Sequence, residues 1–291
     1  MIVITTPTGQ IGRQVLDRLV DGPEPLRVIA REPARLPPRV RERAEVVPSS
    51  HEDAEVVTAA LAGADSLFWV VPPDPGATSI PGHVLRYARS LCAALDVHSP
   101  RIVGVSSLGR GVARNAGQIS AIFAMDALIE SAGVDYRALC MPGFMDNMLR
   151  QVASIRDRGV FFQPGSADRP TPTVATRDIA ATAAELLRDD SWTGQQSVPL
   201  LGPEDLTWDD TARIMSEALD RPIRVQRVPA EAYRASLVEH GMTAAWAEGI
   251  VRMTAAVDGG GYAAETRDPH YPTPTTFRQW CAEVLRPAVR A

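Results

Sequence analysis

The sequence predicts an α/β fold, a Rossmann-type doubly wound parallel sheet followed by a smaller, mainly helical C-terminal lobe. Its first half alternates short β-branched runs with helical stretches, which is typical of βαβ units in a parallel sheet. The run at residues 67–71 is apolar throughout, as expected of a strand whose two faces are both covered by helices. A glycine turn, TGQIG at residues 8–12, joins the first run to the first helical stretch. With 291 residues the chain can bury a substantial core.

The elements of the first half follow in a regular order. Six strands are expected, at residues 2–5, 26–30, 44–47, 66–71, 101–105 and 136–140. Four helices are expected between them, at residues 12–20, 54–61, 83–95 and 119–132. This alternation continues up to about residue 140.

The pattern loosens after residue 141. Residues 163–173 are rich in Pro, Gly, Ser and Asp and are expected to form a loop. A capping box at Thr207–Asp210 predicts the start of a helix. Helices are expected at residues 146–157, 178–189, 207–219, 230–240 and 244–258, a strand at 223–228 and a helical tail at 274–284. We therefore expect one unit over residues 1–200 and a second over 201–291, interleaved with the segment around 141–175.

Composition excludes several classes of partner. The net charge of −5 gives no electrostatic reason to expect nucleic acid or an anionic membrane surface. No apolar run reaches the length of a membrane span. Three widely separated cysteines fit reduced thiols in a cytoplasmic protein rather than a zinc cluster. The five histidines have no ligand spacing, so no metal site is expected.

All 30 basic residues of the chain are arginine, because the sequence contains no lysine. A mechanism that needs a lysine ammonium or a Schiff base therefore cannot operate within this chain.

The glycine turn suits the binding of a pyrophosphate. A strand, a tight turn and a helix start present free backbone N–H groups and a helix dipole to a phosphate. Gly9 allows close backbone approach and Gly12 allows close packing of helix on strand. Thr6 occupies the first position of the usual G-x-x-G-x-x-G spacing, and the same pattern also occurs in simple strand-to-helix turns. The residues expected to hold the pyrophosphate are Thr6, Thr8, Gly9, Gln10, Ile11 and Gly12.

The residue after the second strand predicts the cofactor. This position normally meets the adenosine ribose, where Asp or Glu would select NAD. Here it is Arg31, with Arg35 four residues on, and a guanidinium can bind a 2′-phosphate and stack on adenine. The sequence therefore favours NADP(H) over NAD(H). The alternative is a pair of solvated surface arginines, and Glu32 would repel a phosphate.

Two serines follow the fifth strand, at the sheet edge where open α/β folds bind ligands. Ser107 is a candidate to hydrogen-bond a substrate carbonyl, although serines after strands also satisfy turn backbone groups. Ser106, together with Val71, Pro72 and Pro142 at neighbouring strand exits, is expected to contact the cofactor.

Candidate substrate-binding residues follow the sixth strand and come from the C-terminal lobe. They are Phe144, Met145, Asn147 and Trp246. His83, just after the proline-rich loop at residues 72–81, is the one histidine considered for acid–base work. Core packing is the alternative for both His83 and Trp246.

In order and spacing, these motifs resemble the NmrA-like family of atypical short-chain dehydrogenase/reductases. The resemblance covers nearly the whole chain. It is carried by TGQIG (8–12), AREP (30–33), SSLG (106–109), ESAGVDY (130–136), PGFMDN (142–147), RDIA (177–180) and GPEDLT (202–207). It implies a Rossmann-type domain, a small C-terminal substrate lobe and NADP(H) in the cleft between them.

The chain also departs from that family. Short-chain dehydrogenases generally pair a Tyr with a Lys four residues on, and this chain has no Lys and no Tyr between Tyr87 and Tyr136. The helix after the two serines carries no Lys or His at residues 119–126. Ser49 and Ser50 stand where an aspartate often follows the third strand. Cofactor binding is thus expected without the usual catalytic pair.

These observations predict an NADP(H)-dependent oxidoreductase of a small, largely apolar substrate such as a quinone, enone or imine, with secondary metabolism as a candidate setting. Hydride delivery and positioning can carry most of the rate in such reactions. Two alternatives remain open, a non-enzymatic NADP-sensing regulator and a non-redox isomerase or cyclase. A small-molecule substrate is the expected partner, and the chain is expected to be a monomer or homodimer.

Overall fold

The computed structural model describes residues 1–165 and 168–291. Its centre is a seven-stranded parallel sheet in the order β10-β6-β5-β4-β1-β2-β3. The strands are β1 Ile2–Ile4, β2 Leu26–Ile29, β3 Ala44–Val47, β4 Ser66–Trp69, β5 Arg101–Ser107, β6 Tyr136–Met141 and β10 Gln195–Pro199. The order reverses between β1 and β4, which is the switch point where a doubly wound sheet opens a crevice at the carboxyl ends of its strands. The predicted fold class is confirmed, and β10 is an additional strand that the sequence pattern did not predict.

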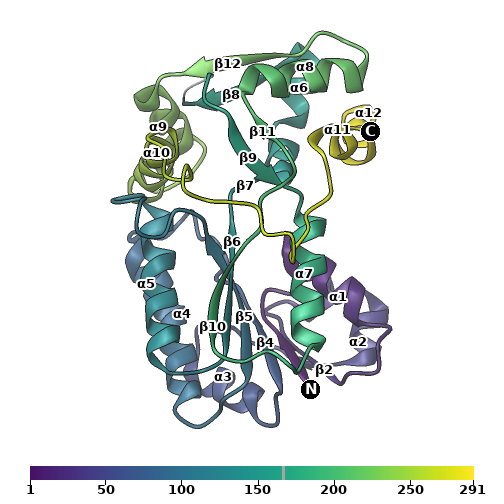
Figure 1. Ribbon diagram of the computed structural model, residues 1–291, viewed down its shortest axis with the longest axis vertical. Coiled ribbons are helices and arrows are strands. Elements are labelled where there is room, and N and C mark those ends of the chain that lie inside the picture. Colours follow the sequence, from purple (N-terminus) through teal and green to yellow (C-terminus); the bar gives the residue numbers. More distant parts are fainter. Residues whose placement is uncertain (166–167) are drawn as a thin grey trace.

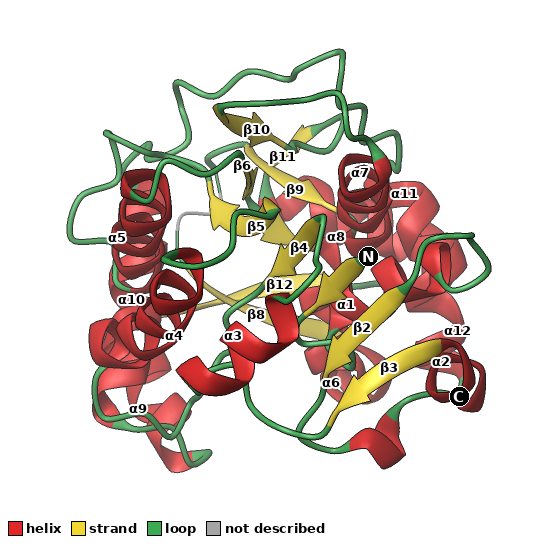
Figure 2. Ribbon diagram, turned by 90° about the horizontal axis from the view of Figure 1, so that it is seen from below, coloured by secondary structure: helices red, strands yellow, loops and turns green. Residues whose placement is uncertain are grey.

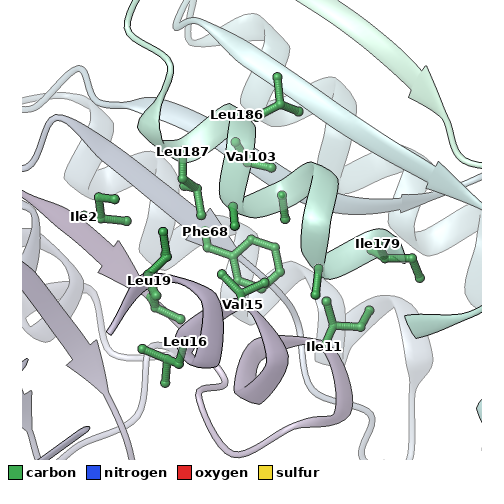
Figure 3. Packing of buried hydrophobic residues seen from close by; sticks show 14 of the residues in the cluster. Ile2, Ile11, Val15, Leu16, Leu19, Phe68, Val103, Ile179, Leu186 and Leu187 are labelled. Carbon is green, nitrogen blue, oxygen red and sulfur yellow. The ribbon is translucent and has the colours of Figure 1, made fainter. Parts of the chain in front are cut away.

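Helices cover both faces of the sheet (Figure 1, Figure 2). One layer contains α3 Ala54–Leu61, α4 Ile80–Leu95 and α5 Gln118–Ser131. The other contains α1 Gln10–Leu19 and α7 Thr176–Arg188, which pack against each other and against Phe68 and Val103 of the sheet (Figure 3). The buried faces of α1 and α7 pack against each other and against the sheet. This packing holds the start of α1 at the edge of the sheet.

Two helices of this unit differ from the expected pattern. Helix α4 begins three residues earlier than predicted, because Ser79 caps it by accepting a hydrogen bond from Gly82 N at 3.1 Å. The short helix α2 Pro38–Arg43 was not predicted, and Pro38 lies at its first position, where a missing N–H costs nothing.

The second lobe has its own core, built around Phe161, Met215 and Trp280. Its helices are α6 Val152–Arg158, α8 Trp208–Leu219, α11 Phe277–Trp280 and α12 Arg286–Arg290, and its strands are β7 Gly143–Phe144, β8 Val160–Pro164, β9 Thr171–Val174, β11 Asp205–Leu206 and β12 Arg224–Val228. The segment after β6 contributes β7, α6, β8 and β9 to it. The division of the chain near residue 200 stays a prediction.

Expectations for this lobe were partly wrong. The predicted loop at 163–173 begins inside β8 and ends inside β9, and its residues 166–167 lie outside the described part. The predicted helix at 146–157 is a 3₁₀ helix over Met145–Gln151 followed by α6. The capping box is confirmed, since Thr207 Oγ1 accepts from Asp210 N at 3.0 Å.

Residues 259–276, which we call the strap, connect α10 Ala244–Asp258 to α11. Helix α10 packs on α9 Ala230–Glu239 and on the ends of α4 and α5. From there the strap crosses above the carboxyl edge of the sheet, as the yellow segment in Figure 1 shows. Within the described residues, no helix has the length and apolar character needed to cross a membrane.

Candidate functional site

The glycine turn after β1 holds α1 very close to the strand. Gly9 N donates to Thr6 O at 3.0 Å. A β-carbon at Gly12 would lie only 2.2 Å from the same oxygen, far inside van der Waals contact. Glycine is therefore required at position 12 for the start of α1 to lie against the turn.

The N-terminus of α1 is open to an anion. Gly9 is the N-cap residue and no side chain caps the helix in the described structure. Its first-turn N–H groups and the positive end of its dipole thus meet the crevice at the switch point. A helix N-terminus of this kind binds the pyrophosphate of a dinucleotide, and the glycine turn with the uncapped start of α1 fits a pyrophosphate.

Thr6 replaces the first glycine of the pattern in an unfavourable conformation. Its φ is +51°, in the left-handed region that a β-branched residue rarely adopts. Thr6 Oγ1 donates to Val70 O at 2.9 Å. The adjacent Thr5 Oγ1 donates to Phe68 O at 2.9 Å and accepts from Val70 N at 3.0 Å. Both threonines therefore bind the turn to the end of β4, which holds Thr6 in this conformation.

Arg31 and Arg35 lie exposed beyond the end of β2. Arg35 pairs with Glu32 at 3.4 Å, whereas no ion pair or hydrogen bond holds the Arg31 guanidinium in the described ranges. Burial, and secondarily the Arg31 charge, lowers the pKa of the neighbouring His51 to about 4, so this histidine is neutral at physiological pH. Arg31 is thus the guanidinium available at the position where the adenosine ribose would lie.

Ser106 is held inside the protein by an unexpected carboxylate. Its Oγ donates to Asp126 Oδ2 at 2.5 Å, and Tyr136 OH donates to Asp126 Oδ1 at 2.7 Å. Asp126 is 1% exposed, and burial raises its pKa to about 6 although both hydrogen bonds lower it. Gly104 makes room for the ring, since a β-carbon there would lie 2.6 Å from Tyr136 OH.

Sequence reasoning missed Asp126. Its signal is a single acidic residue between Met125 and Ile129, both of which are fully buried on α5. An acidic residue on the buried side of a helix needs hydrogen-bond donors, and Ser106 and Tyr136 supply them.

Ser107 lies half-buried at the carboxyl end of β5 and meets the strap. Its hydroxyl donates to Leu108 O at 3.2 Å, and its side chain lies close enough to Tyr262 to influence the pKa of that hydroxyl. The next loop residue, Gly109, donates its N–H to Glu265 Oε1 at 2.7 Å. The strap thus contacts the exit of β5 through one hydrogen bond and through the close approach of Gly261 O to Gly109, and sequence reasoning did not select Tyr262.

The remaining predicted site residues divide into two groups. Val71, Pro72 and Phe144 are half-buried at the exits of β4 and β6, beside the buried Pro142, while Asn147 is exposed. Met145, His83 and Trp246 are 3%, 3% and 5% exposed, respectively. Met145 packs in the core of the second lobe.

His83 and Trp246 lie together in the core between α4 and α10. Their ring centroids are 5.9 Å apart, and His83 Nε2 lies 2.8 Å from Pro72 O. Both are thus engaged in packing and backbone contacts. In the described ranges no group of three or more His, Cys, Asp or Glu side chains could hold a metal ion.

An open helix N-terminus on a glycine turn at the switch point of a parallel sheet defines a dinucleotide-binding, Rossmann-type protein. The family comparison agrees with this class. Residues 7–190 match the family model described as NAD(P)H-binding, and the chain belongs to that family. The predicted nicotinamide cofactor and the resemblance to the NmrA-like reductases are thereby confirmed at the level of the family.

Two curated relatives match most of the chain. The NAD(P)H azoreductase of Xenophilus azovorans is 24% identical over 255 residues, which cover 86% of this chain and 85% of the relative. The (4-alkanoyl-5-oxo-2,5-dihydrofuran-3-yl)methyl phosphate reductase of Streptomyces griseus subsp. griseus is 29% identical over 244 residues, which cover 82% and 80%.

Solved structures share the fold over the full chain. The NADPH-dependent quinone oxidoreductase of Escherichia coli complexed with NADPH has a TM-score of 0.79 and 20% identity, covering 98% of this chain and 99% of that one. The triphenylmethane reductase of Citrobacter sp. has a TM-score of 0.80 and 20% identity with the same coverage. The Rossmann-type sheet and the C-terminal lobe therefore recur together.

Proposed function

We propose that the chain is an NADP(H)-dependent reductase of a small, largely apolar acceptor such as a quinone, an enone or an imine. The observation that carries this proposal is the uncapped, glycine-bounded N-terminus of α1 at the switch point, beside the exit of β5. The curated relatives support the direction of the reaction, because both are named as reductases.

The proposed cofactor site runs along the carboxyl edge of the sheet. The turn from Thr6 to Gly12 would hold the pyrophosphate through backbone N–H groups. Arg31, which is exposed and unpaired among the described residues, would bind the 2′-phosphate and favour NADP(H) over NAD(H). Val71, Pro72 and Pro142 would line the nicotinamide end. When bound, the dinucleotide supplies a hydride.

The proposed substrate site lies above that end. Phe144 and Asn147 would form its wall, and Ser107 would orient the acceptor oxygen through its hydroxyl. Close positioning of the acceptor is the main contribution that these residues make to the rate. Since the chain has no lysine, the Tyr-Lys pair of typical short-chain dehydrogenases is absent from it.

Binding and turnover of NADPH by the purified protein test the proposal. We expect micromolar binding of NADPH, weaker binding of NADH, and oxidation of NADPH in the presence of at least one acceptor from a panel of quinones, enones and imines. Failure to bind or oxidise NADPH would refute the proposal. Tight binding without turnover would favour an NADP-sensing regulator, and substrate conversion without NADPH consumption would favour an isomerase or cyclase.

A further inference from the structure

We propose that Tyr262 of the strap is the proton donor of this reductase, an inference that rests on the proposed function. Reduction of a carbonyl, enone or azo acceptor needs one proton as well as one hydride. Typical short-chain dehydrogenases take this proton from a Tyr activated by a Lys, and this chain has no Lys. Another side chain or a water molecule must therefore supply the proton at the exit of β5.

Several contacts hold Tyr262 at that exit. Tyr262 lies between Gly261 and Glu265, both of which contact Gly109, and its hydroxyl is near the Ser107 side chain, the group proposed to orient the acceptor oxygen. The strap approaches so closely that a β-carbon at Gly109 would lie 2.5 Å from Gly261 O. Glu265 Oε1 accepts from Gly109 N at 2.7 Å on the other side of Tyr262. The ring also packs partly buried against the apolar core and lines a pocket with Thr171, Pro172 and Leu201.

The strap is fixed at its far side as well. Arg267 Nε donates to Gly202 O at 2.7 Å, and Thr275 Oγ1 donates to Asp178 Oδ1 at 2.8 Å. Tyr262 thus belongs to a segment that is attached on both sides of the cleft. A proton donor needs such a fixed position to stay within hydrogen-bond reach of its acceptor.

Other titratable groups near this edge have competing roles in the described structure. Asp126 accepts from Ser106 and Tyr136, and the Tyr136 hydroxyl donates to it in the interior. His83 is bound to Pro72 O. Glu265 accepts the Gly109 N–H.

The environment keeps Tyr262 in its acid form. Burial raises the pKa of its hydroxyl, the nearby Ser107 side chain lowers it, and the Glu265 charge raises it again. In an enone the β-carbon accepts the hydride pair and the carbonyl oxygen becomes an enolate oxygen. The Tyr262 O–H bond breaks as the new O–H bond on that oxygen forms. Water then returns a proton to the phenolate, so each turnover consumes one NADPH and one proton.

Two acceptors that differ in their proton requirement test Tyr262. An enone needs a proton, whereas a cationic triarylmethyl dye is neutralised by the hydride alone. We expect Tyr262→Phe to lower kcat for the enone about 100- to 1,000-fold and to leave dye reduction and NADPH binding within about 2-fold of the unmodified chain. Tyr271→Phe is the matched control, because Tyr271 lies half-buried on the same strap and away from Ser107, and it should change neither rate.

A measurement on the unmodified chain gives a second test. Enone turnover should slow in deuterated water at the plateau of its pH profile, and dye turnover should not. The proposal is overturned if Tyr262→Phe reduces the enone at the normal rate, or if both acceptors lose activity equally. An absence of NADPH oxidation by the unmodified chain with the dye and with the whole panel of quinones, enones and imines would instead refute the reductase function itself, and the inference with it.

Discussion

Replacing Asp126 with Asn should make the protein more stable at neutral pH and change how its stability depends on pH. The carboxyl is 1% exposed, and its pKa is about 6 in the folded protein against 3.8 as the reference value. A raised pKa means that the folded state binds the proton more tightly than the unfolded state. The stabilisation from the protonated form is therefore complete below pH 3.8 and is lost as the pH rises through about 6.

The size of the effect follows from these two pKa values. By proton linkage the ionised carboxyl lowers the free energy of unfolding by ~1.6 kcal/mol at pH 5 and by ~3 kcal/mol at pH 7.5. An Asn at this position carries no charge, and its amide can accept from Tyr136 and donate to Ser106, at a cost of about 1 kcal/mol for the altered hydrogen bonds. Asp126→Asn should thus be near neutral at pH 5 and about 2 kcal/mol more stable than the unmodified chain at pH 7.5.

Urea unfolding of both proteins at pH 5, 6, 7 and 7.5 measures this difference. The quantity that matters is the change in the free-energy difference between variant and unmodified chain, expected to grow by ~1.4 kcal/mol from pH 5 to pH 7.5. Other carboxylates cancel in this difference, because they are common to both proteins. A difference that stays constant with pH, or that shrinks as pH rises, would show that burial does not raise the pKa of Asp126 as argued.

Four further substitutions address the proposed cofactor site, two in the glycine turn and two beyond the end of β2. Gly12→Ala places a β-carbon 2.2 Å from Thr6 O. It should therefore weaken NADPH binding at least ~10-fold and lower the free energy of unfolding by ~1–3 kcal/mol. Unchanged NADPH titration and urea unfolding curves would contradict the close approach of the helix to the turn. Arg31→Gln should raise the Kd for NADPH ~10-fold and leave the Kd for NADH unchanged. Arg35→Gln should have a smaller effect, because Arg35 pairs with Glu32. If Arg31→Gln weakens the binding of both cofactors equally, a contact between Arg31 and the 2′-phosphate is excluded. Thr6→Gly should change the free energy of unfolding by less than ~1 kcal/mol, because the relief of ~1–2 kcal/mol of left-handed backbone strain offsets the loss of the hydrogen bond to Val70 O. A loss above ~2 kcal/mol in urea unfolding would show that the backbone of Thr6 is not strained.

The sequence predicted those strands whose burial leaves a clear pattern. Strands β1, β4 and β6 are buried throughout, and the six predicted strands alternate with helices as βαβ units require. The edge strand β10 reads Gln-Gln-Ser-Val-Pro, and its first three residues are exposed, so only its pairing with β6 identifies it. Strands β7 and β11 have two residues each, too few for any periodicity to appear. These strands are defined by pairing with strands that are distant in the sequence.

Some residues of the candidate site could be placed from the sequence and others could not. The turn at Thr6–Gly12, Arg31 and Ser107 could be placed from sequence because the carboxyl ends of parallel strands share one edge. Tyr262 could not, since its position depends on the path of an irregular strap. The structure buries His83 and Trp246 together, because aromatic edges and a backbone carbonyl satisfy both side chains within the core.

The two adjacent serines of β5 have different surroundings. Successive side chains of a strand point to opposite sides, so Ser106 and Ser107 cannot share one role. Ser106 points to α5, where Asp126 fixes its hydroxyl in the interior. Ser107 points to the strap, where it meets Tyr262. An activating cation beside Tyr262 would lower the pKa of its hydroxyl, whereas burial and the nearby Glu265 raise it, so the hydroxyl is protonated at neutral pH and holds the proton that the proposed step transfers.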